Sequence, residues 1–370
     1  YFDNNATTKP FPIVQAAYAE AMQKYWANPS SPSRASARVR AKLNGAREKI
    51  ANTIGIPSDA ITFTSGSTEA NNSILAHAAH SSAADAQALI SSIEHPSVSE
   101  SARHWFSGQV QLIPAESSGT IDLECFSDLI DQLPRLAIVC LMAANNETGV
   151  LQPWLEVAEL CRKRGVKFHC DATQWVGKLP LNDLAGCSSF CASAHKFGGP
   201  KGVGLLASEE PHPFVFGGSQ ENGRRGGTEN YPGVEAMSVA LHFANDHLSE
   251  SHQRSAWRDS FEETMLGGFE GIKILGSDVT RLWNTSALVM PDFENMHYVS
   301  KLDKLGFEVS TGSACSSGVA AKSPVSFAMG LSKSESKRII RVSSYVDQGE
   351  EDWQGLASAF EQARAELERD

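Results

Sequence analysis

Short apolar runs alternate with amphipathic stretches over most of the chain. The amphipathic stretches have helical spacing, and we expect helices at 67–80, 96–106, 122–133 and 153–164. The apolar runs are typical of strands, which we expect at 60–65, 88–93, 110–115, 136–143, 166–171, 188–194 and 202–207. This alternation predicts an α/β fold in which helices cover a mostly parallel seven-stranded sheet.

The pattern changes after about residue 245. Longer helices are predicted at 250–267 and 349–368, around short strands at 284–290, 307–311 and 338–343. We therefore expect a large domain formed by residues 13–245 and a smaller α+β domain formed by residues 1–12 and 246–370.

The overall charge excludes two classes of partner. The net charge is −11, so the chain has no basic surplus for nucleic acid or an anionic membrane. The basic residues between Arg34 and Arg47 are spaced like the solvated face of a helix. The printed sequence opens without a basic-then-apolar leader, and no apolar run approaches the length of a membrane span. We expect a cytoplasmic protein.

The seven cysteines do not predict a disulfide framework. Cys140 lies in the apolar run LAIVCLMAA, where a small buried side chain is expected. Cys187 and Cys191 have no second pair at zinc-site spacing, so we expect no metal site. Cys315 differs from these, because it lies among small residues in STGSACSSG, which predicts a flexible loop that displays the thiol.

Ligands of open α/β sheets bind beyond the carboxyl ends of the strands, and several polar motifs fall there. SGSTEA (65–70) could cradle a phosphate through Ser67, Thr68 and free N–H groups, or it could form a helix capping box. His95 should lie near a helix N-cap, in a structural or a catalytic role. The stretch NNETG (145–149) predicts a ligand contact or an Asx-type turn.

Two more strand ends carry charged side chains. Asp171 follows a strand that we expect to be buried on both faces, where a carboxylate needs a positive partner or strong donors. Ser193, His195 and Lys196 follow the next strand, and Lys196 is a candidate Schiff-base lysine, although a lysine that neutralises carboxylates is commoner. An anion cradle, a buried carboxylate and a lysine on one sheet edge predict a site for pyridoxal phosphate (PLP).

With these motifs the chain resembles the cysteine desulfurases of the NifS/IscS type, within the class V group of fold-type I PLP enzymes. The resemblance covers the chain from start to finish. The matching stretches are YFDNNATT (1–8), NPSS (28–31), TFTSGSTEANN (62–72), IEHPSV (93–98), MAANNETGVLQP (142–153), CDATQWVGK (170–178), SAHKFGGPKGVG (193–204), RRGGTEN (224–230), STGSACSSG (310–318) and IIRVSS (339–344).

The resemblance implies a role for each matching residue. Lys196 would form the Schiff base, His95 would stack on the ring and assist proton transfer, and Cys315 would attack the substrate sulfur. Asn146 and Arg341 would bind the substrate carboxylate. Thr228 would reach the phosphate of a second subunit, which implies a homodimer with shared active sites. The cofactor-binding set would be Ser67, Thr68, His95, Asn146, Asp171, Gln174, Ser193, His195, Lys196 and Thr228.

The implied reaction converts L-cysteine to L-alanine and leaves a persulfide on Cys315. A sulfur-acceptor protein would then receive the sulfur for iron–sulfur cluster assembly or another thio-modification. A selenocysteine lyase, a class V aminotransferase and a non-catalytic scaffold protein are the alternatives. The chain departs from the family pattern at Ser33, where a histidine is common, and at Tyr345 and Val346, where the family usually has glycine and arginine.

Overall fold

The structure is a computed structural model that describes residues 1–210, 212–312 and 323–369. Its main feature is a seven-stranded sheet with the strand order β1-β7-β6-β5-β4-β2-β3. β7 is antiparallel to both of its neighbours, β1 and β6, whereas the pairs from β6 to β3 are parallel. The predicted mostly parallel sheet is therefore confirmed.

The strands of this sheet begin and end within two residues of the predicted positions. They are formed by apolar runs whose residues are mostly buried, since helices cover both faces of the sheet. Their bounds are β1 Ile61–Thr64, β2 Gln87–Ser91, β3 Val110–Ile113, β4 Leu136–Met142, β5 Lys167–Asp171, β6 Ser189–Ser193 and β7 Gly204–Ser208.

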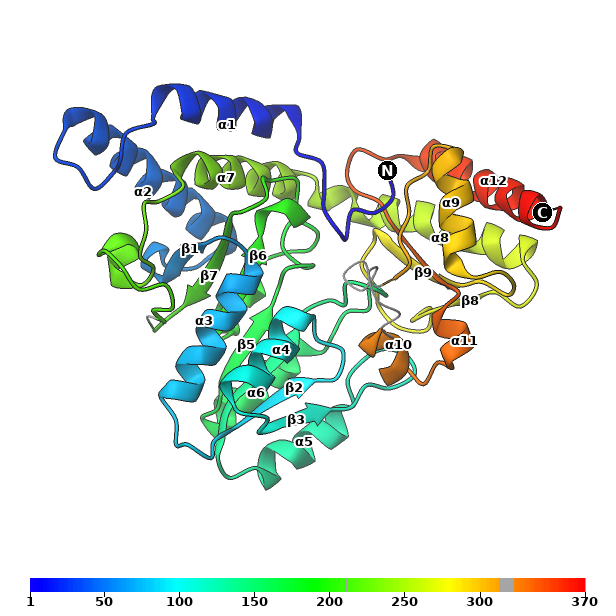
Figure 1. Cartoon of the computed structure of the whole chain (residues 1–370), viewed down its shortest axis with the longest axis horizontal. Helices are drawn as coiled ribbons and strands as arrows, with labels where there is room; N and C mark the ends of the chain where they lie inside the picture. Colours follow the sequence, from blue (N-terminus) through cyan, green and yellow to red (C-terminus); the bar gives the residue numbers. More distant parts are fainter. Residues whose placement is uncertain (211, 313–322, 370) are drawn as a thin grey trace.

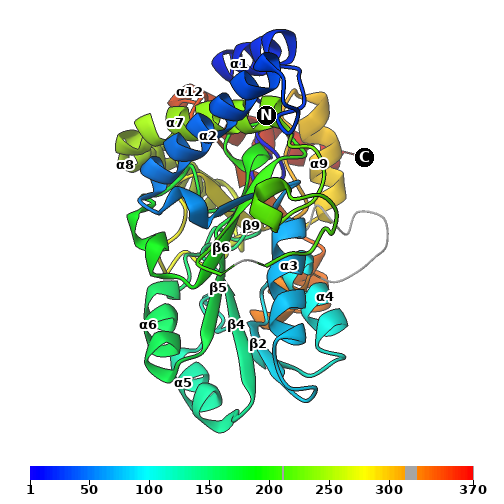
Figure 2. The ribbon, with the colours of Figure 1, turned by 90° about the vertical axis from the view of Figure 1, so that its left-hand side faces the viewer.

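The two faces of the sheet bury alternate residues of each strand. Along β4, Val139 and Leu141 belong to the largest apolar cluster, while Ile138 and Cys140 pack in the cluster on the opposite face. Figure 2 shows helices on both sides of β4 and β5. One side has α3 (Ser67–His80) and α4 (Pro96–Trp105), and the other has α5 (Leu123–Gln132) and α6 (Trp154–Arg164).

Three further helices lie over the β1 end of the sheet, and α7 packs against each of the other two (Figure 1). They are α1 (Pro12–Lys24), α2 (Arg34–Ile54) and α7 (Tyr231–Asp246). α2 contains the basic stretch that was expected to be helical. It begins after Ser33, whose hydroxyl accepts the Ser36 N–H over 3.2 Å, and ends at Gly55 in the left-handed conformation (φ +84°).

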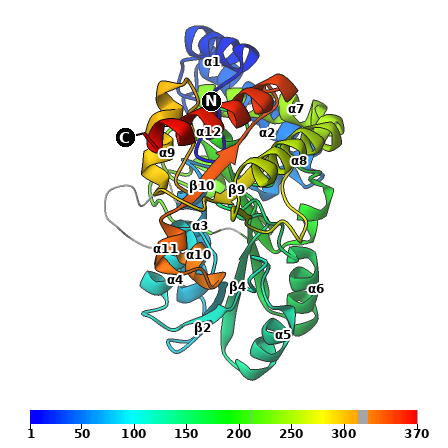
Figure 3. The same ribbon diagram turned by 90° about the vertical axis from the view of Figure 1, so that its right-hand side faces the viewer.

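The C-terminal part of the chain has its own antiparallel sheet, in the order β10-β9-β8 (Figure 3). Its strands are β8 Lys273–Ile274, β9 Thr285–Val289 and β10 Ile339–Ser343, and its long helices are α8 Ser251–Gly268, α9 Asn295–Lys304 and α12 Glu350–Leu367. Two short helices, α10 Pro324–Ala328 and α11 Lys333–Ser336, precede β10. The predicted strand at 307–311 is wrong. Between the left-handed Gly306 and Gly312, this stretch forms only an isolated bridge from Ser310 to Arg341.

The N-terminal segment links the two sheets. Phe2 is buried in the apolar cluster around β9 and β10, whereas Phe11 and Val14 belong to the cluster of the large sheet. Between Phe2 and Phe11 the chain therefore passes from the small sheet to the large sheet (Figure 1). The division into residues 13–245 and the remainder stays a prediction. None of the helices described here is long and apolar enough to cross a membrane.

Candidate active site

The carboxyl ends of the parallel strands open into a cavity of about 480 Å³. Residues that follow β1, β2, β4, β5 and β6 line it, together with Asn5, Ala6 and Arg341. The structure therefore brings together ten of the predicted site residues, although their individual roles stay predictions. They are Ser67, Thr68, His95, Asn146, Asp171, Gln174, Ser193, His195, Lys196 and Arg341.

The start of α3 has the features of an anion cradle. Its N-cap residue is Gly66, which has no side chain to accept a hydrogen bond, so the capping-box alternative is wrong. The Ser67 N–H donates to Ser193 Oγ over 2.7 Å, and that hydroxyl lies 3.0 Å from Ser67 Oγ. A Cβ at position 66 would come within 3.2 Å of Ser193 Oγ, and φ is +150° there. Hydroxyls and N–H groups at a helix N-terminus fit a phosphate.

Asp171 is buried at the end of β5 and is held by donors. Its Oδ1 accepts the Thr173 N–H over 3.0 Å, and its Oδ2 accepts Nδ2 of Asn71 over 3.0 Å. Both carboxylate oxygens thus have a hydrogen-bond donor in a buried position. The expectation of a buried carboxylate supported by strong donors is met.

His95 is the N-cap residue of α4, as predicted. Its Nδ1 accepts the Ser97 N–H over 3.1 Å, while Pro96 occupies the first helical position. Burial lowers the pKa of His95 below its ordinary value, and the charge of Lys196 lowers it further, whereas Asp171 acts in the opposite direction. The ring is therefore neutral at neutral pH and lies on the cavity wall.

Lys196 points its amine at the N-terminal segment. Nζ donates to the carbonyl oxygens of Asn5, over 2.6 Å, and of Ala6, over 2.8 Å. The preceding residue, His195, contacts Thr7 Oγ1 through Nδ1 over 3.2 Å. Burial and then the nearby Lys196 lower the pKa of His195 to about 4. A neutral His195 has one ring proton to donate.

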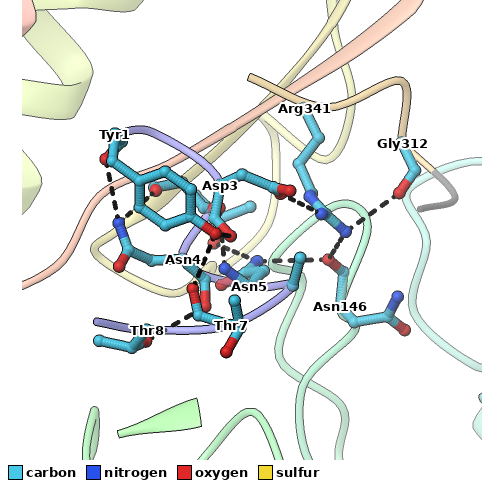
Figure 4. Close-up of polar contacts among 12 residues, drawn as sticks. Tyr1, Asp3, Asn4, Asn5, Thr7, Thr8, Asn146, Gly312 and Arg341 are labelled. Atoms are coloured by element: carbon cyan, nitrogen blue, oxygen red, sulfur yellow. Dashed lines mark hydrogen bonds and ion pairs between the residues drawn. The ribbon is translucent and has the colours of Figure 1, made fainter. Parts of the chain in front are cut away.

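Arg341 lies on β10 of the small sheet and reaches the same cavity (Figure 4). Its Nη2 forms an ion pair with Asp3, and its Nη1 donates to the carbonyl oxygens of Asn146 (3.1 Å) and Gly312 (3.0 Å). Nε is buried and has no hydrogen-bond partner among the described residues. Two of the five guanidinium N–H groups, one on Nε and one on Nη2, thus make no hydrogen bond to the described residues.

The turn after β4 confirms the Asx-type turn considered for NNETG, while a ligand contact there stays a prediction. Asn145 is fully buried, and its Oδ1 accepts the N–H groups of Glu147 (2.9 Å) and Thr148 (3.0 Å), which is an Asx-type turn. Asn146 instead lines the cavity. Asn145 therefore forms the turn, and Asn146 faces the cavity.

Gln174 is fixed by the buried Lys178. Lys178 Nζ donates to Gln174 Oε1 and, over 3.1 Å, to Asn5 Oδ1, while Gln174 Nε2 donates to the Asn5 carbonyl over 2.9 Å. Burial holds the pKa of Lys178 well below its ordinary value, and the charges of Lys196 and Arg341 lower it further. Apart from its place in the motif CDATQWVGK, no sequence feature singles out Lys178.

Two buried glutamates on the cavity wall were also missed. Glu94 Oε1 accepts from Ser91 Oγ (2.6 Å) and the Met142 N–H (2.7 Å), and its Oε2 has no partner among the described residues. Burial, reinforced by the charge of Asp171, raises the pKa of Glu94 to about 8. Burial also raises the pKa of Glu147, which accepts from Ser323 Oγ over 2.6 Å. Glu94 directly precedes His95, and this adjacency was the available signal.

Two predicted residues are not among those that line the cavity. Thr228 is exposed on the segment before α7 and is not part of the wall. Cys315 lies outside the described residues, so its predicted role and loop are untested. Both ends of the undescribed stretch nevertheless meet the cavity, since Gly312 O accepts from Arg341 and Ser323 Oγ donates to Glu147.

The departures from the family pattern have structural reasons. Ser33 caps α2, which a hydroxyl does well. Tyr345 is fully buried between the rings of Phe11 and Trp283 and donates its hydroxyl to Gly177 O over 3.0 Å. Val346 packs against the same apolar cluster. None of the three lines the cavity, so these substitutions change the packing rather than the cavity wall.

Comparison with known proteins gives concordant matches. The family model described as "Aminotransferase class-V" matches residues 1–356. A cysteine desulfurase of Sinorhizobium fredii is 35% identical over 93% of this chain and 90% of its own length. One of Cereibacter sphaeroides is 37% identical over 89% of this chain and 86% of its own length.

A solved structure described as a NifS-like protein superimposes with a TM-score of 0.90, at 30% identity and over 99% of both chains. The sequence matches and this superposition cover nearly the same residues, including every strand that positions the cavity. The chain therefore belongs to the class V aminotransferase family and, within it, to the group of the NifS-like cysteine desulfurases.

Proposed function

We propose that this protein is a PLP-dependent cysteine desulfurase that converts L-cysteine to L-alanine and transfers the sulfur to Cys315. One observation carries the proposal: the same cavity is lined by the amine of Lys196, by the buried carboxylate of Asp171, which accepts hydrogen bonds, and by Arg341. The Nε of Arg341 has no hydrogen-bond partner among the described residues. The curated relatives named cysteine desulfurase support it over nearly the whole chain.

The residues of the cavity fit the cofactor. Ser67, Thr68, Ser193 and His195 would hold the phosphate, because they present hydroxyls, N–H groups and a neutral ring at the start of α3. Asp171 would hold the ring nitrogen, and Lys196 would bind the aldehyde. When bound, PLP supplies an aldehyde that captures amines and a ring that withdraws electrons from the substrate Cα.

The chain's own groups would bind and orient the substrate. Arg341 would donate to the carboxylate from the N–H groups of Nε and Nη2 that the described residues do not use, because Nη1 already donates to two carbonyl oxygens. Asn146 would lie beside this carboxylate, and Gln174, oriented by Lys178, would face the ring hydroxyl. Lys196 Nζ and His95 are the groups on the wall that can take a proton from the substrate Cα.

Cys315 would take the sulfur atom. Its thiolate forms an S–S bond with the substrate sulfur while the Cβ–S bond breaks, and Cβ keeps the bonding electron pair and gains a proton. Cys315 follows Gly312 by three residues, which span at most about 10 Å when extended. Since Gly312 contacts Arg341 at the cavity, this reach supports the assignment.

We further infer a homodimer in which Thr228 reaches the phosphate of the partner's site. The exposed position of Thr228, away from the cavity of its own chain, supports this inference. The persulfide would pass to a sulfur-acceptor protein for iron–sulfur cluster assembly or another thio-modification, in the cytoplasm. The net charge of −11 supports a partner that is neither nucleic acid nor an anionic membrane.

The test is to incubate the purified holoenzyme with L-cysteine and to measure alanine and reductant-released sulfide. We expect the two in equal amounts, and no product from Lys196→Ala. Cys315→Ala should form no persulfide, whereas the matched control Cys125→Ala, at the least buried of the six described cysteines, should behave like the wild type. A keto acid product, or full alanine formation by Cys315→Ala, would reject the proposal.

A further inference from the structure

Asn71 is a fully buried residue of α3 that does not line the cavity but bonds to two residues that do. Its Nδ2 donates to Asp171 Oδ2 over 3.0 Å and to Ser97 Oγ over 2.9 Å, and Ser97 Oγ in turn contacts His95 Nδ1 over 2.8 Å. We propose that Asn71 is a positioning residue that holds the carboxylate of Asp171 and orients the Ser97 hydroxyl toward Nδ1 of His95. The proposal rests on the desulfurase function proposed above.

The direction of the hydrogen bonds can be assigned from the His95 end. The Ser97 N–H donates to His95 Nδ1 over 3.1 Å, and a backbone N–H cannot accept, so Nδ1 carries no proton. The Ser97 hydroxyl, which also contacts Nδ1, must then be a donor to it. Its oxygen is left to accept from Asn71. The neutral ring of His95 therefore carries its proton on Nε2.

The Asp171 end gives the same orientation of the Asn71 amide independently. If the amide were turned over, its oxygen would lie 3.0 Å from a carboxylate oxygen, and neither atom could donate. The carboxylate therefore requires the amide nitrogen at this position. Thr173 N–H occupies the other carboxylate oxygen, so both oxygens of Asp171 have assigned donors.

The amide oxygen of Asn71 accepts from two donors, a histidine ring and a thiol. Asn71 Oδ1 lies 2.8 Å from His169 Nε2 and 3.1 Å from the thiol of Cys191. Burial lowers the pKa of His169 to about 4, so this ring is neutral and has one proton to give. His169 Nδ1 then accepts from Ser189 Oγ, over 2.8 Å. All four hydrogen-bonding positions of the Asn71 amide are thus used, and the amide cannot turn over without breaking them.

This arrangement has a consequence for the reaction. The same amide supports the carboxylate that would hold the ring nitrogen of PLP and orients the hydroxyl that, together with the Ser97 N–H, donates to His95. A change at Asn71 should therefore affect the chemical step rather than the binding of the substrate carboxylate, because Arg341 makes no contact with this network.

The kinetic test uses the holoenzyme with Asn71→Ala, Ser97→Ala and both together. Each single change should lower kcat with L-cysteine roughly 10- to 100-fold, the effect of a hydrogen bond to a charged or catalytic group, with KM within about threefold. The double variant should be no slower than Asn71→Ala alone, since both act on His95 through one chain. If the kcat effects of the two single changes multiply in the double variant, the proposal is overturned. The matched control Asn72→Ala, which loses contacts to Thr68 and Trp105 only, should stay within about threefold of the wild type.

A second measurement does not depend on activity. Nitrogen-15 NMR of histidine-labelled wild-type holoenzyme, with His95→Gln and His169→Gln as assignment variants, should show both rings neutral and protonated on Nε2. A proton on Nδ1 of His95, or a cationic ring at neutral pH, would overturn the proposal even if a variant fails to fold. Wild-type holoenzyme that is inactive on cysteine but gives the expected spectrum would reject the proposed function and leave the network intact.

Discussion

Replacing Glu94 by glutamine should change how the stability of the protein depends on pH. Glu94 is 4% exposed, and burial raises its pKa from 4.5 to about 8. Between these two values the native state keeps a proton that the unfolded state releases. Rising pH therefore favours unfolding across this window, and the stability that the neutral acid contributes at low pH is lost as pH approaches 8.

The size of the effect follows from the two pKa values. Each pKa unit corresponds to 1.36 kcal/mol, so the shift amounts to about 5 kcal/mol in all, of which roughly 3–4 kcal/mol falls between pH 5 and pH 8. Glutamine resembles the protonated acid, because its oxygen can still accept from Ser91 and from the Met142 N–H. As pH rises from 5 to 8, the free energy of unfolding should therefore fall by about 3–4 kcal/mol less in the Glu94→Gln protein than in the wild type.

The assay is urea unfolding of the holoenzyme at several pH values, followed by tryptophan fluorescence. Glu100→Gln is the matched control, since Glu100 is exposed and pairs only with the neighbouring Arg103. It should follow the wild type within about 0.5 kcal/mol at every pH. If the difference between Glu94→Gln and the wild type stays constant from pH 5 to pH 8, the inferred protonation of Glu94 is wrong.

Three further changes have expected outcomes. Arg341→Lys should raise KM for L-cysteine at least about tenfold, with a smaller effect on kcat. The reason is that a lysine lacks the planar guanidinium that can donate to Asp3, to two carbonyl oxygens and to a substrate carboxylate at once. Unchanged steady-state kinetics would contradict this. Tyr345→Phe leaves the Gly177 carbonyl without its donor and should lower the free energy of unfolding by about 1–2 kcal/mol in urea. Ser33→Ala removes the cap of α2 and should lower it by about 1 kcal/mol, whereas Ser33→Asp should restore it.

The large sheet could be predicted from the sequence because its strands are buried on both faces. Continuous apolar runs such as LAIVCLM at β4 are then sufficient, and strand-to-helix alternation indicates the parallel order. The small sheet β10-β9-β8 was harder to predict. β8 has two residues, and the stretch at 307–311 has a strand-like composition but pairs only at Ser310. Local pattern carries little information about such short pairings.

Part of the predicted site was found from the rule that ligands bind where strands end, whereas Arg341, Thr228 and Cys315 were assigned from the family resemblance. That rule brought Ser67, His95, Asp171 and Lys196 to one edge, where the structure has them. The rule could not find Asn71 or His169, because these lie inside an element and act through another side chain. Their signal is a polar side chain at a core position, which has a physical explanation only after its partners are known.

The N-terminal segment shows why part of the site needs the three-dimensional structure. Asp3 pairs with Arg341, which is 338 residues away, and the Asn5 and Ala6 carbonyls accept from Lys196. These contacts lie within four consecutive residues, between an arginine of the small sheet and the lysine that follows β6 of the large one. Figure 4 shows the pair of Asp3 and Arg341. A few residues of backbone thus set the spacing between the amine that would bind the cofactor and the guanidinium that would bind the substrate. No local sequence pattern encodes that spacing, because it depends on how the two sheets meet.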